Sequence, residues 1–206
     1  MEIFEDIQEN SMIGKRVGVY ELKREIGRGG MGAVYLAERV DGEFRQTVAI
    51  KLIKRGMDTD LILKRFRRER QIIAALDHPN IVRILDSGTL ADGNPFMVME
   101  YIAGYSLNKV LKENEKLPFD FIAHVAESVT DALSAAHSQK ILHRDIKPAN
   151  IYACRMGLEY DFVKVLDFGL VKVRDRAPGL DTLVTMDHTT TGTPAYMAPE
   201  IIVGEA

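Results

Sequence analysis

The stretch HRDIKPAN, from His143 to Asn150, decides the fold of this chain. It packs four ionisable side chains, a proline and an amide into eight residues. A solvated surface loop would explain any one of these side chains, but it does not explain their joint placement. The segments around the stretch therefore decide between a loop and a site.

Two short strands are predicted around a turn signal at Arg155 to Gly157, with NIYA at 150–153 before it and VKVLDFG at 163–169 after it. If the two strands pair as a hairpin, Asn150 and Asp167 lie side by side. An amide oxygen and a carboxylate together suit a hard cation such as Mg²⁺ that carries phosphates. The pattern therefore predicts a metal site at the open end of the hairpin.

Asp145 and Lys147 belong to the same loop and need no role as metal ligands. A carboxylate such as Asp145, placed near the metal, can accept a proton from an incoming hydroxyl or orient that hydroxyl. Lys147 would neutralise charge on the transferred group. The loop is thus interpreted as a site for phosphate chemistry.

A glycine pattern, GxGxxG, occurs upstream at Gly27, Gly29 and Gly32. A dinucleotide-binding turn has a helix after its glycines, whereas strand-like segments at 20–26 and 33–39 flank these. Glycines in such a hairpin let the backbone lie close over a ligand, with N–H groups toward phosphate oxygens. The alternative is a flexible hairpin tip without a ligand, and the pattern alone does not separate the two.

Lys51 lies within the apolar strand predicted at 47–53, where a lysine ordinarily extends toward water. On the helix predicted from Asp58 to Leu76, Glu69 falls inside the apolar stripe. Two charges that leave water are natural partners, and the remaining ammonium hydrogens would reach a nucleotide phosphate. The alternative is that the two residues are unrelated.

Hydrophobic periodicity divides the chain into a strand-rich part and a helical part. The first is expected to be an antiparallel sheet of five strands with one helix, and the strands are predicted at 20–26, 33–39, 47–53, 81–85 and 96–101. A helix is predicted from Phe119 to His137, with Pro118 as its start signal. One face of this helix carries Ile122, Val125, Val129, Leu133 and Ala136.

Composition limits the partners and the compartment. The net charge of −3 argues against nucleic acid or an anionic membrane as the main partner. The single cysteine, Cys154, is expected to be a packed residue in a reducing setting. No apolar stretch has membrane-spanning length, so we expect a cytoplasmic chain without a membrane segment, although tethering through a region beyond Ala206 stays open.

From Tyr20 to about Glu200 the motifs GRGGMG, VAIK, HPNIV, HRDIKPAN, DFG and APE follow one another in the order of a known family. The chain resembles the catalytic domain of a eukaryotic-like (Hanks-type) serine/threonine protein kinase, and GTPAYMAPE is particularly similar to bacterial members. The resemblance implies an α+β, two-lobed fold. Residues 1–17 would be an extension, 18–102 the N-lobe and hinge, and 103–206 the start of a mainly helical C-lobe, truncated at its C-terminus.

The resemblance also implies site roles, with ATP and Mg²⁺ as cofactors. Asp145 would be the catalytic base, assisted by Lys147, and Asn150 and Asp167 would bind the metal. The residues implied in nucleotide binding are Gly27, Gly29, Gly30, Gly32, Val34, Ala49, Lys51, Glu69, Met99, Glu100, Ile102 and Tyr152. Tyr152 departs from the family, in which this position is usually aliphatic. A hydrophobic spine would contain Ile73, Ile84, His143 and Phe168.

The expected reaction is transfer of the γ-phosphate to serine or threonine hydroxyls of proteins, because KPAN and GTPAY resemble the serine/threonine pattern. The threonine-rich segment 181–194 is expected to undergo autophosphorylation, with a second copy of the chain as a partner. The residues expected to regulate the site are Arg65, Arg144, Lys172, Thr185 and Thr193. The rival classes are a regulatory nucleotide-binding module without transfer and a small-molecule kinase.

Overall fold

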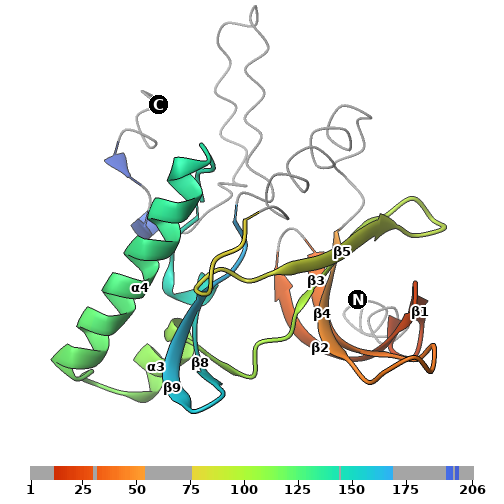
Figure 1. The fold of residues 1–206 in the computed structure, drawn as a ribbon, viewed down its shortest axis with the longest axis horizontal. Coiled ribbons are helices and arrows are strands. Elements are labelled where there is room, and N and C mark those ends of the chain that lie inside the picture. The colour runs from red at the N-terminus through yellow and green to blue at the C-terminus, as the bar shows by residue number, and fades with distance from the viewer. Residues whose placement is uncertain are drawn as a thin grey trace, which may run out of the picture. The chain divides into compact units, whose positions relative to one another are not determined.

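The computed structural model describes residues 12–29, 32–53, 76–143, 145–168, 194–196 and 198–199. The chain divides into two compact units. The first unit comprises Met1–Asp58 and Val82–Ile102, and the second comprises Thr59–Ile81 and Ala103–Ala206. Each unit has a sheet of its own (Figure 1).

The first unit contains a curled antiparallel sheet in the order β1-β2-β3-β4-β6-β5 (Figure 1). Its strands are β1 (Arg16–Val17), β2 (Tyr20–Gly29), β3 (Gly32–Arg39), β4 (Thr47–Ile53), β5 (Ile84–Thr89) and β6 (Pro95–Glu100). All five expected strands have a counterpart, and the antiparallel order of β2, β3 and β4 is confirmed. The sheet differs from the expectation by a sixth strand, β1, which pairs only Arg16 and Val17 with the start of β2.

The strand register separates the sheet into two faces, because residues directly opposite each other share a face. Tyr35 pairs with Ile50, and Ile50 pairs with Val98. These three side chains are buried in one apolar cluster together with Leu22. We call this side of the sheet the core face, and its burial fixes which residues remain for the other side.

The start of β5 corrects the strand predicted at 81–85, because β5 begins only at Ile84. Ile81 instead forms an isolated parallel bridge with Val165, within the second unit. The Asn80 side chain donates to the Val163 carbonyl at 2.8 Å, and the Asn80 carbonyl accepts from the Val165 N–H at 2.7 Å. These bonds hold Ile81 in the second unit, so its apolar side chain does not indicate a strand of the first sheet.

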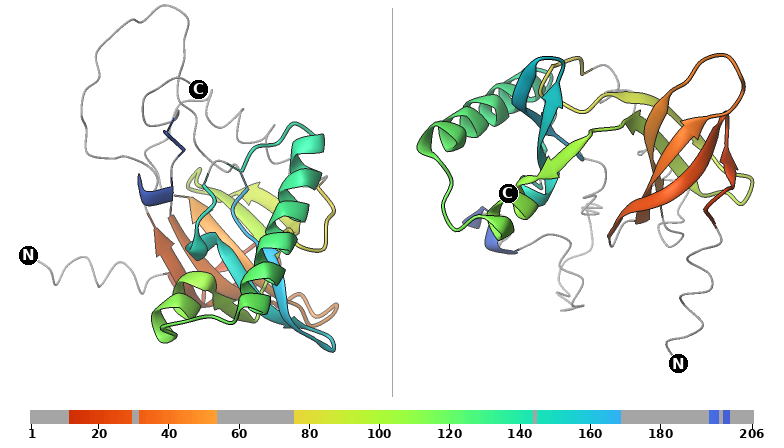
Figure 2. Two further views of the ribbon diagram at one scale, coloured as in Figure 1. Left: turned by 90° about the vertical axis from the view of Figure 1, so that its left-hand side faces the viewer. Right: turned by 90° about the horizontal axis from the view of Figure 1, so that it is seen from below.

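The second unit combines a small sheet with two helices. Its elements are β7 (Gly104–Ser106), α3 (Leu107–Glu113), α4 (Phe119–Ser138), the 3₁₀ turn η2 (Pro148–Asn150), β8 (Ile151–Met156), β9 (Glu159–Val165) and the 3₁₀ turn η3 (Pro194–Tyr196). The predicted hairpin is confirmed as the antiparallel pair β8–β9, and β7 pairs with β8 on the side away from β9. α4 runs alongside this sheet (Figures 1 and 2).

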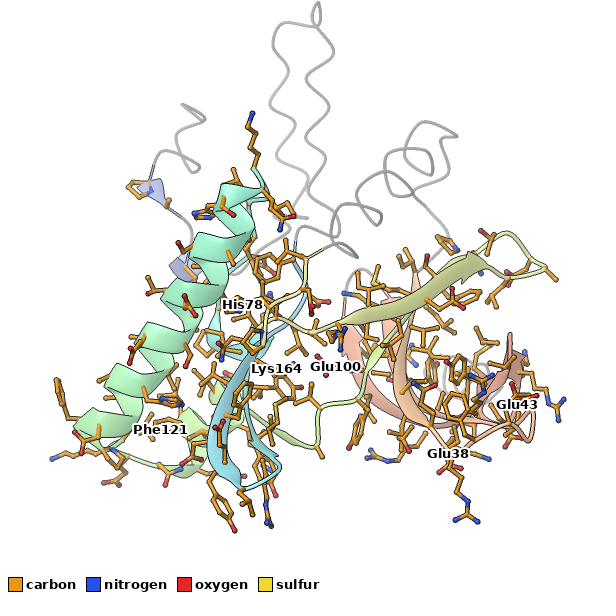
Figure 3. The ribbon with its side chains drawn as sticks, viewed as in Figure 1. Glu38, Glu43, His78, Glu100, Phe121 and Lys164 are labelled. Atoms are coloured by element: carbon orange, nitrogen blue, oxygen red, sulfur yellow. The ribbon has the colours of Figure 1, made fainter. Side chains whose placement is uncertain are left out.

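Helix α4 begins after Pro118, as predicted, but its buried face is rotated at its first turn. Phe121 packs against the cluster formed by Leu107, Ile151 and Val163 (Figure 3). Ile122 is 49% exposed, which corrects its expected place on the buried face. In the part of the chain that the structure describes, no helix has both the length and the apolar character needed to cross a membrane.

Strands β7 and β8 approach each other closely at Gly104, which pairs with Cys154. A Cβ atom on Gly104 would lie 2.3 Å from the Ala153 carbonyl oxygen and 2.7 Å from the Cys154 Cβ. The Cys154 thiol is buried and lies 3.3 Å from the Phe162 carbonyl oxygen. Glycine is therefore required sterically at this contact.

Candidate active site

The second face of the first sheet, which we call the ligand face, carries the predicted lysine. Val34 pairs with Lys51, which pairs with Met97, so these three side chains share it. The neighbouring set on the same face is Leu36, Ala49 and Met99. Lys51 is 7% exposed, so its long side chain is covered rather than extended into water. The ligand face thus combines a buried ammonium with an apolar surface.

The glycines of the β2–β3 hairpin lie on the ligand face. Gly27 pairs with Val34, and Gly29 pairs with Gly32. Gly32 has φ +140°, and a Cβ atom there would lie 1.9 Å from the Leu52 carbonyl oxygen. Only glycine fits this approach, and the other two glycines leave the face without side chains beside Val34. The geometry suits a ligand that contacts backbone rather than side chains.

Strand β6 ends at the segment predicted to contact a base. Met99 is buried, whereas Glu100 and Ile102 are half-buried. The Glu100 carboxylate accepts a hydrogen bond of 2.8 Å from the Arg83 backbone N–H, and the Glu100 backbone N–H donates to the Arg83 carbonyl at 3.0 Å. These bonds fix the backbone at the end of β6.

In the second unit, Asp145 bonds to other residues of the segment 143–150, which we call the polar loop. Its Oδ2 lies 2.9 Å from the Lys147 Nζ and 3.2 Å from the Asn150 Nδ2. The Asn150 Nδ2 also donates to the Asp145 backbone carbonyl at 2.8 Å. The carboxylate is partly exposed, and two polar side chains of the same loop fix its orientation.

Asn150 and Asp167 lie at neighbouring positions across the open end of the β8–β9 hairpin. Ile151 pairs with Val165, and the Leu166 N–H donates to the Asn150 carbonyl at 2.8 Å. The register therefore places Asn150 opposite Leu166, one residue before Asp167. Asp167 has φ +61°, a left-handed conformation that is uncommon outside glycine and frequent at functional sites.

The donor set at this end of the hairpin fits Mg²⁺. The Asn150 Nδ2 donates to the backbone carbonyl and to the Oδ2 of Asp145, so the amide oxygen is the Asn150 atom suited to a metal. Mg²⁺ usually takes one or two protein oxygens and completes its shell with phosphates and water. In the described part of the chain, no group of three or more His, Cys, Asp or Glu side chains is placed to hold a metal ion.

His143 connects the polar loop to β9. Its Nδ1 accepts a 3.2 Å hydrogen bond from the Asp145 N–H, so the ring proton lies on Nε2, which donates to the Leu166 carbonyl at 2.8 Å. Burial lowers the pKa of His143, while the Leu166 carbonyl and the nearby carboxylates act in the opposite direction. The ring also packs on Phe168, with centroids 4.6 Å apart. The neutral imidazole thus holds both the Asp145 backbone and the segment before Asp167.

Comparison with known proteins agrees with this geometry. The family model described as protein kinase domain matches residues 20–206. The chain belongs to the protein kinase family. It is 37% identical over 190 residues to the serine/threonine-protein kinase pkn3 of Myxococcus xanthus and 39% identical over 191 residues to the serine/threonine-protein kinase PrkC of Bacillus subtilis, covering 91% and 92% of this chain. The crystal structure of the Mycobacterium tuberculosis PknI kinase domain matches with a TM-score of 0.66 at 30% identity, over 77% of this chain.

The kinase relatives are longer than this chain. It spans 34% of the length of pkn3 and 28% of the length of PrkC, and the match covers 63% of the PknI kinase-domain chain. The α+β kinase fold is shared with the PknI domain. The family assignment therefore concerns the catalytic domain, and the activity of the whole protein is a separate question.

Tyr152, the residue at which the sequence departs from the kinase pattern, lies in the middle of the three-stranded sheet. It pairs with Ser106 on one side and with Lys164 on the other, so the three share the face opposite to Ile151 and Val163. Lys164 is 2% exposed and is labelled on β9 in Figure 3. Tyr152 itself is half-buried.

Some predicted kinase residues lie outside the described residues. They are Gly30, Arg65, Glu69, Ile73, Arg144, Lys172, Thr185 and Thr193, together with the helix expected between Asp58 and Leu76 apart from Leu76 itself. Their roles stay predictions. Of the expected spine, the contact between His143 and Phe168 is present.

Two residues of the ligand face were missed by the sequence analysis. Met97 is fully buried opposite Lys51, and Leu36 lies opposite Ala49. A usable signal was present, because Met97 and Met99 alternate along one strand and must share a face once Met99 is assigned to it.

Proposed function

We propose that this chain is the catalytic part of a serine/threonine protein kinase, which transfers the γ-phosphate of ATP to serine and threonine hydroxyls of proteins. The observation that carries the proposal is the arrangement of Asp145, Lys147 and Asn150 next to Asp167. Phosphoryl transfer depends mainly on positioning and on charge neutralisation, and this loop offers groups for both. The compartment in this proposal is the cytoplasm, and the support for it is the single cysteine of the chain.

In this proposal the two units have separate tasks. The glycine hairpin and Lys51 of the ligand face bind the phosphates of ATP through backbone N–H groups and an ammonium. Asp145 orients the substrate hydroxyl and accepts its proton, and Lys147 offsets charge on the transferred group. Asn150 and Asp167 would hold Mg²⁺, which supplies charge neutralisation to the phosphates when it is bound.

The same proposal includes regulation by autophosphorylation of the threonine-rich segment 181–194, with a second copy of the chain as the partner. A phosphothreonine, first of all at Thr185, would pair with Arg144, assisted by Lys172 and Arg65. The support for it is the threonine content of the segment and the arginine directly before Asp145.

The rival classes differ in what they do with ATP. A regulatory nucleotide-binding module would keep the fold and bind nucleotide without turnover. The chain retains Lys51, Asp145, Asn150 and Asp167, which disfavours this class. A small-molecule kinase would phosphorylate metabolites and leave peptides unmodified.

One experiment tests the proposal and separates the rivals. The complete protein is incubated with Mg²⁺ and labelled ATP in the presence of either a serine/threonine peptide library or a metabolite panel, with chelator as the control. We expect label in peptides and, by mass spectrometry, in the segment 181–194 of the protein itself. Label only in metabolites, or nucleotide binding without label in any acceptor, would exclude the proposed function.

A further inference from the structure

An ion pair brackets the first glycine of the β2–β3 hairpin. The Arg28 Nε donates to the Glu25 Oε1 at 2.8 Å, and the Arg28 Nη2 contacts the Glu25 Oε2. Two parallel contacts between a guanidinium and a carboxylate fix the relative orientation of both groups, which a single contact does not. The side chains are 35% and 29% exposed, so solvent screens them only in part.

Tyr35 supports this pair from the neighbouring strand. It lies opposite Glu25 in the register and is 3% exposed. The hydrogen bond from Arg28 is the main cause that lowers the pKa of Glu25, and the Tyr35 side chain acts in the same direction. Burial, followed by the charge of Glu25, raises the pKa of Tyr35. The carboxylate is therefore held ionised between a cation and a phenol.

The pair lies on the face opposite to the glycines. Glu25 pairs with Tyr35 and Arg28 pairs with Ala33, and both partners belong to the core face. Gly27 and Gly29 occupy register positions of the ligand face, the face that also carries Lys51. The Glu25–Arg28 ion pair therefore lies on the core face of the hairpin, and the surface proposed to bind phosphates is the opposite face.

The pair also spans an irregularity in the strand. The register of β2 against β3 shifts between Glu25 and Gly27, so Glu25 lies before the bulge and Arg28 after it. Bulges and glycines both weaken the specification of register, because neither supplies a full set of packed side chains. The two contacts between Glu25 and Arg28 span the bulge and so help to fix the register of β2 against β3.

We propose that Glu25, Arg28 and Tyr35 form a brace that fixes the register of the glycine hairpin, and that Glu25 and Arg28 are positioning residues for ATP binding. The inference rests on the proposed function, since it assigns the glycine hairpin to the phosphates of ATP. Loss of either charge lets the hairpin sample shifted registers, in which its N–H groups no longer meet the phosphates together. The chemical step, carried out by the polar loop, is not affected.

The test measures initial rates of the complete protein while the concentrations of ATP and of an unphosphorylated serine/threonine acceptor peptide are varied separately. Glu25→Gln and Arg28→Gln should each raise KM for ATP roughly fivefold, the factor that corresponds to the upper range of a partly exposed ion pair. KM for the peptide and kcat should stay within about twofold of the unsubstituted protein. The charge exchange Glu25→Arg with Arg28→Glu should recover most of the loss.

The matched control is Glu21→Gln, which removes the Glu21–Lys23 ion pair at the other register shift of the same strand, between Leu22 and Arg24 and farther from the glycines. We expect it to leave KM for ATP unchanged. An equal rise of KM in this control, an unchanged KM in both brace variants, or a lower KM in Glu25→Gln caused by a released Arg28 would each overturn the brace. An inactive unsubstituted protein would instead refute the proposed function, so the two failures are distinguishable.

Discussion

The ligand face of the first unit and the polar loop of the second hold their groups by different means. On the ligand face, backbone register places Lys51, Val34 and the glycines, and strand pairing supplies the order. In the polar loop, side chains bond to one another and to backbone, with Asp145 bound to Lys147 and Asn150. The stability of the sheet should therefore be most sensitive to added volume where strands are in close contact, whereas the polar loop should be most sensitive to the loss of a polar atom.

The largest effect is expected from removal of one carboxylate in the second unit, at Asp167 or at Asp145. Asp167→Ala should abolish Mg²⁺-dependent phosphate transfer, because the metal would lose its carboxylate ligand beside Asn150. Asp145→Asn should lower turnover roughly 100-fold or more, because it removes the proton acceptor. Nucleotide affinity should persist in the Asp145 variant, which titration with a fluorescent ATP analogue measures. Full turnover in either variant would remove that residue from the proposed mechanism.

An intermediate effect is expected from a methyl group added to the ligand face. Gly32→Ala should lower the free energy of unfolding by about 2 kcal/mol or more, because the new Cβ meets the Leu52 carbonyl and the backbone has φ +140°. Gly29→Ala is the matched control, since a Cβ there has no neighbour within 4 Å. Thermal unfolding of both variants measures the difference. Equal melting temperatures would show that the hairpin is not packed as described.

The smallest effect concerns the acid side of the stability profile. Burial lowers the folded-state pKa of His143 below its value of 6.5 in the unfolded chain, so the unfolded state binds more protons as the pH falls below 6.5. Stability should be full above this pH and should decline toward the lower folded-state pKa, by at most about 1.4 kcal/mol per pH unit.

The variant His143→Gln isolates this contribution. It should show a shallower decline of the unfolding midpoint between about pH 6.5 and pH 5, because one titrating group is lost. Denaturant titrations at several pH values measure the slope. A parallel profile in the variant would show that other groups cause the acid sensitivity.

Strand β4 is the element whose bounds the sequence predicted best. In TVAIKLI, Val48 and Ile50 alternate with Ala49 and Lys51, and the observed bounds of β4 are those predicted. Alternation failed at 81–85, because the Asn80 side chain bonds to β9 and retains Ile81 in the second unit. An apolar side chain alone does not reveal which sheet covers it.

At the end of the β8–β9 hairpin, the sequence predicted which residues are neighbours but not the hydrogen bonds that hold them. The hairpin prediction placed Asn150 beside Asp167, and the register agrees with it. The bonds from Asn150 to Asp145 and from His143 to the Asp145 N–H depend on the path of the loop backbone. Neither residue spacing nor periodicity encodes that path.

The prediction that Ile122 lies on the buried face of α4 was wrong. A helical face is wide enough for the neighbouring Phe121 to take the buried position instead.

The close contact at Gly104 gives the second unit a built-in reporter. Cys154 carries the one thiol of this chain; it is buried, pairs with Gly104 of β7, and has its Sγ 3.3 Å from the Phe162 carbonyl of β9. A maleimide dye needs an accessible thiolate, so alkylation of this chain would require local opening of the β7–β8–β9 sheet first. The rate of dye incorporation would then count opening events of that sheet in the natural sequence, without any engineered label.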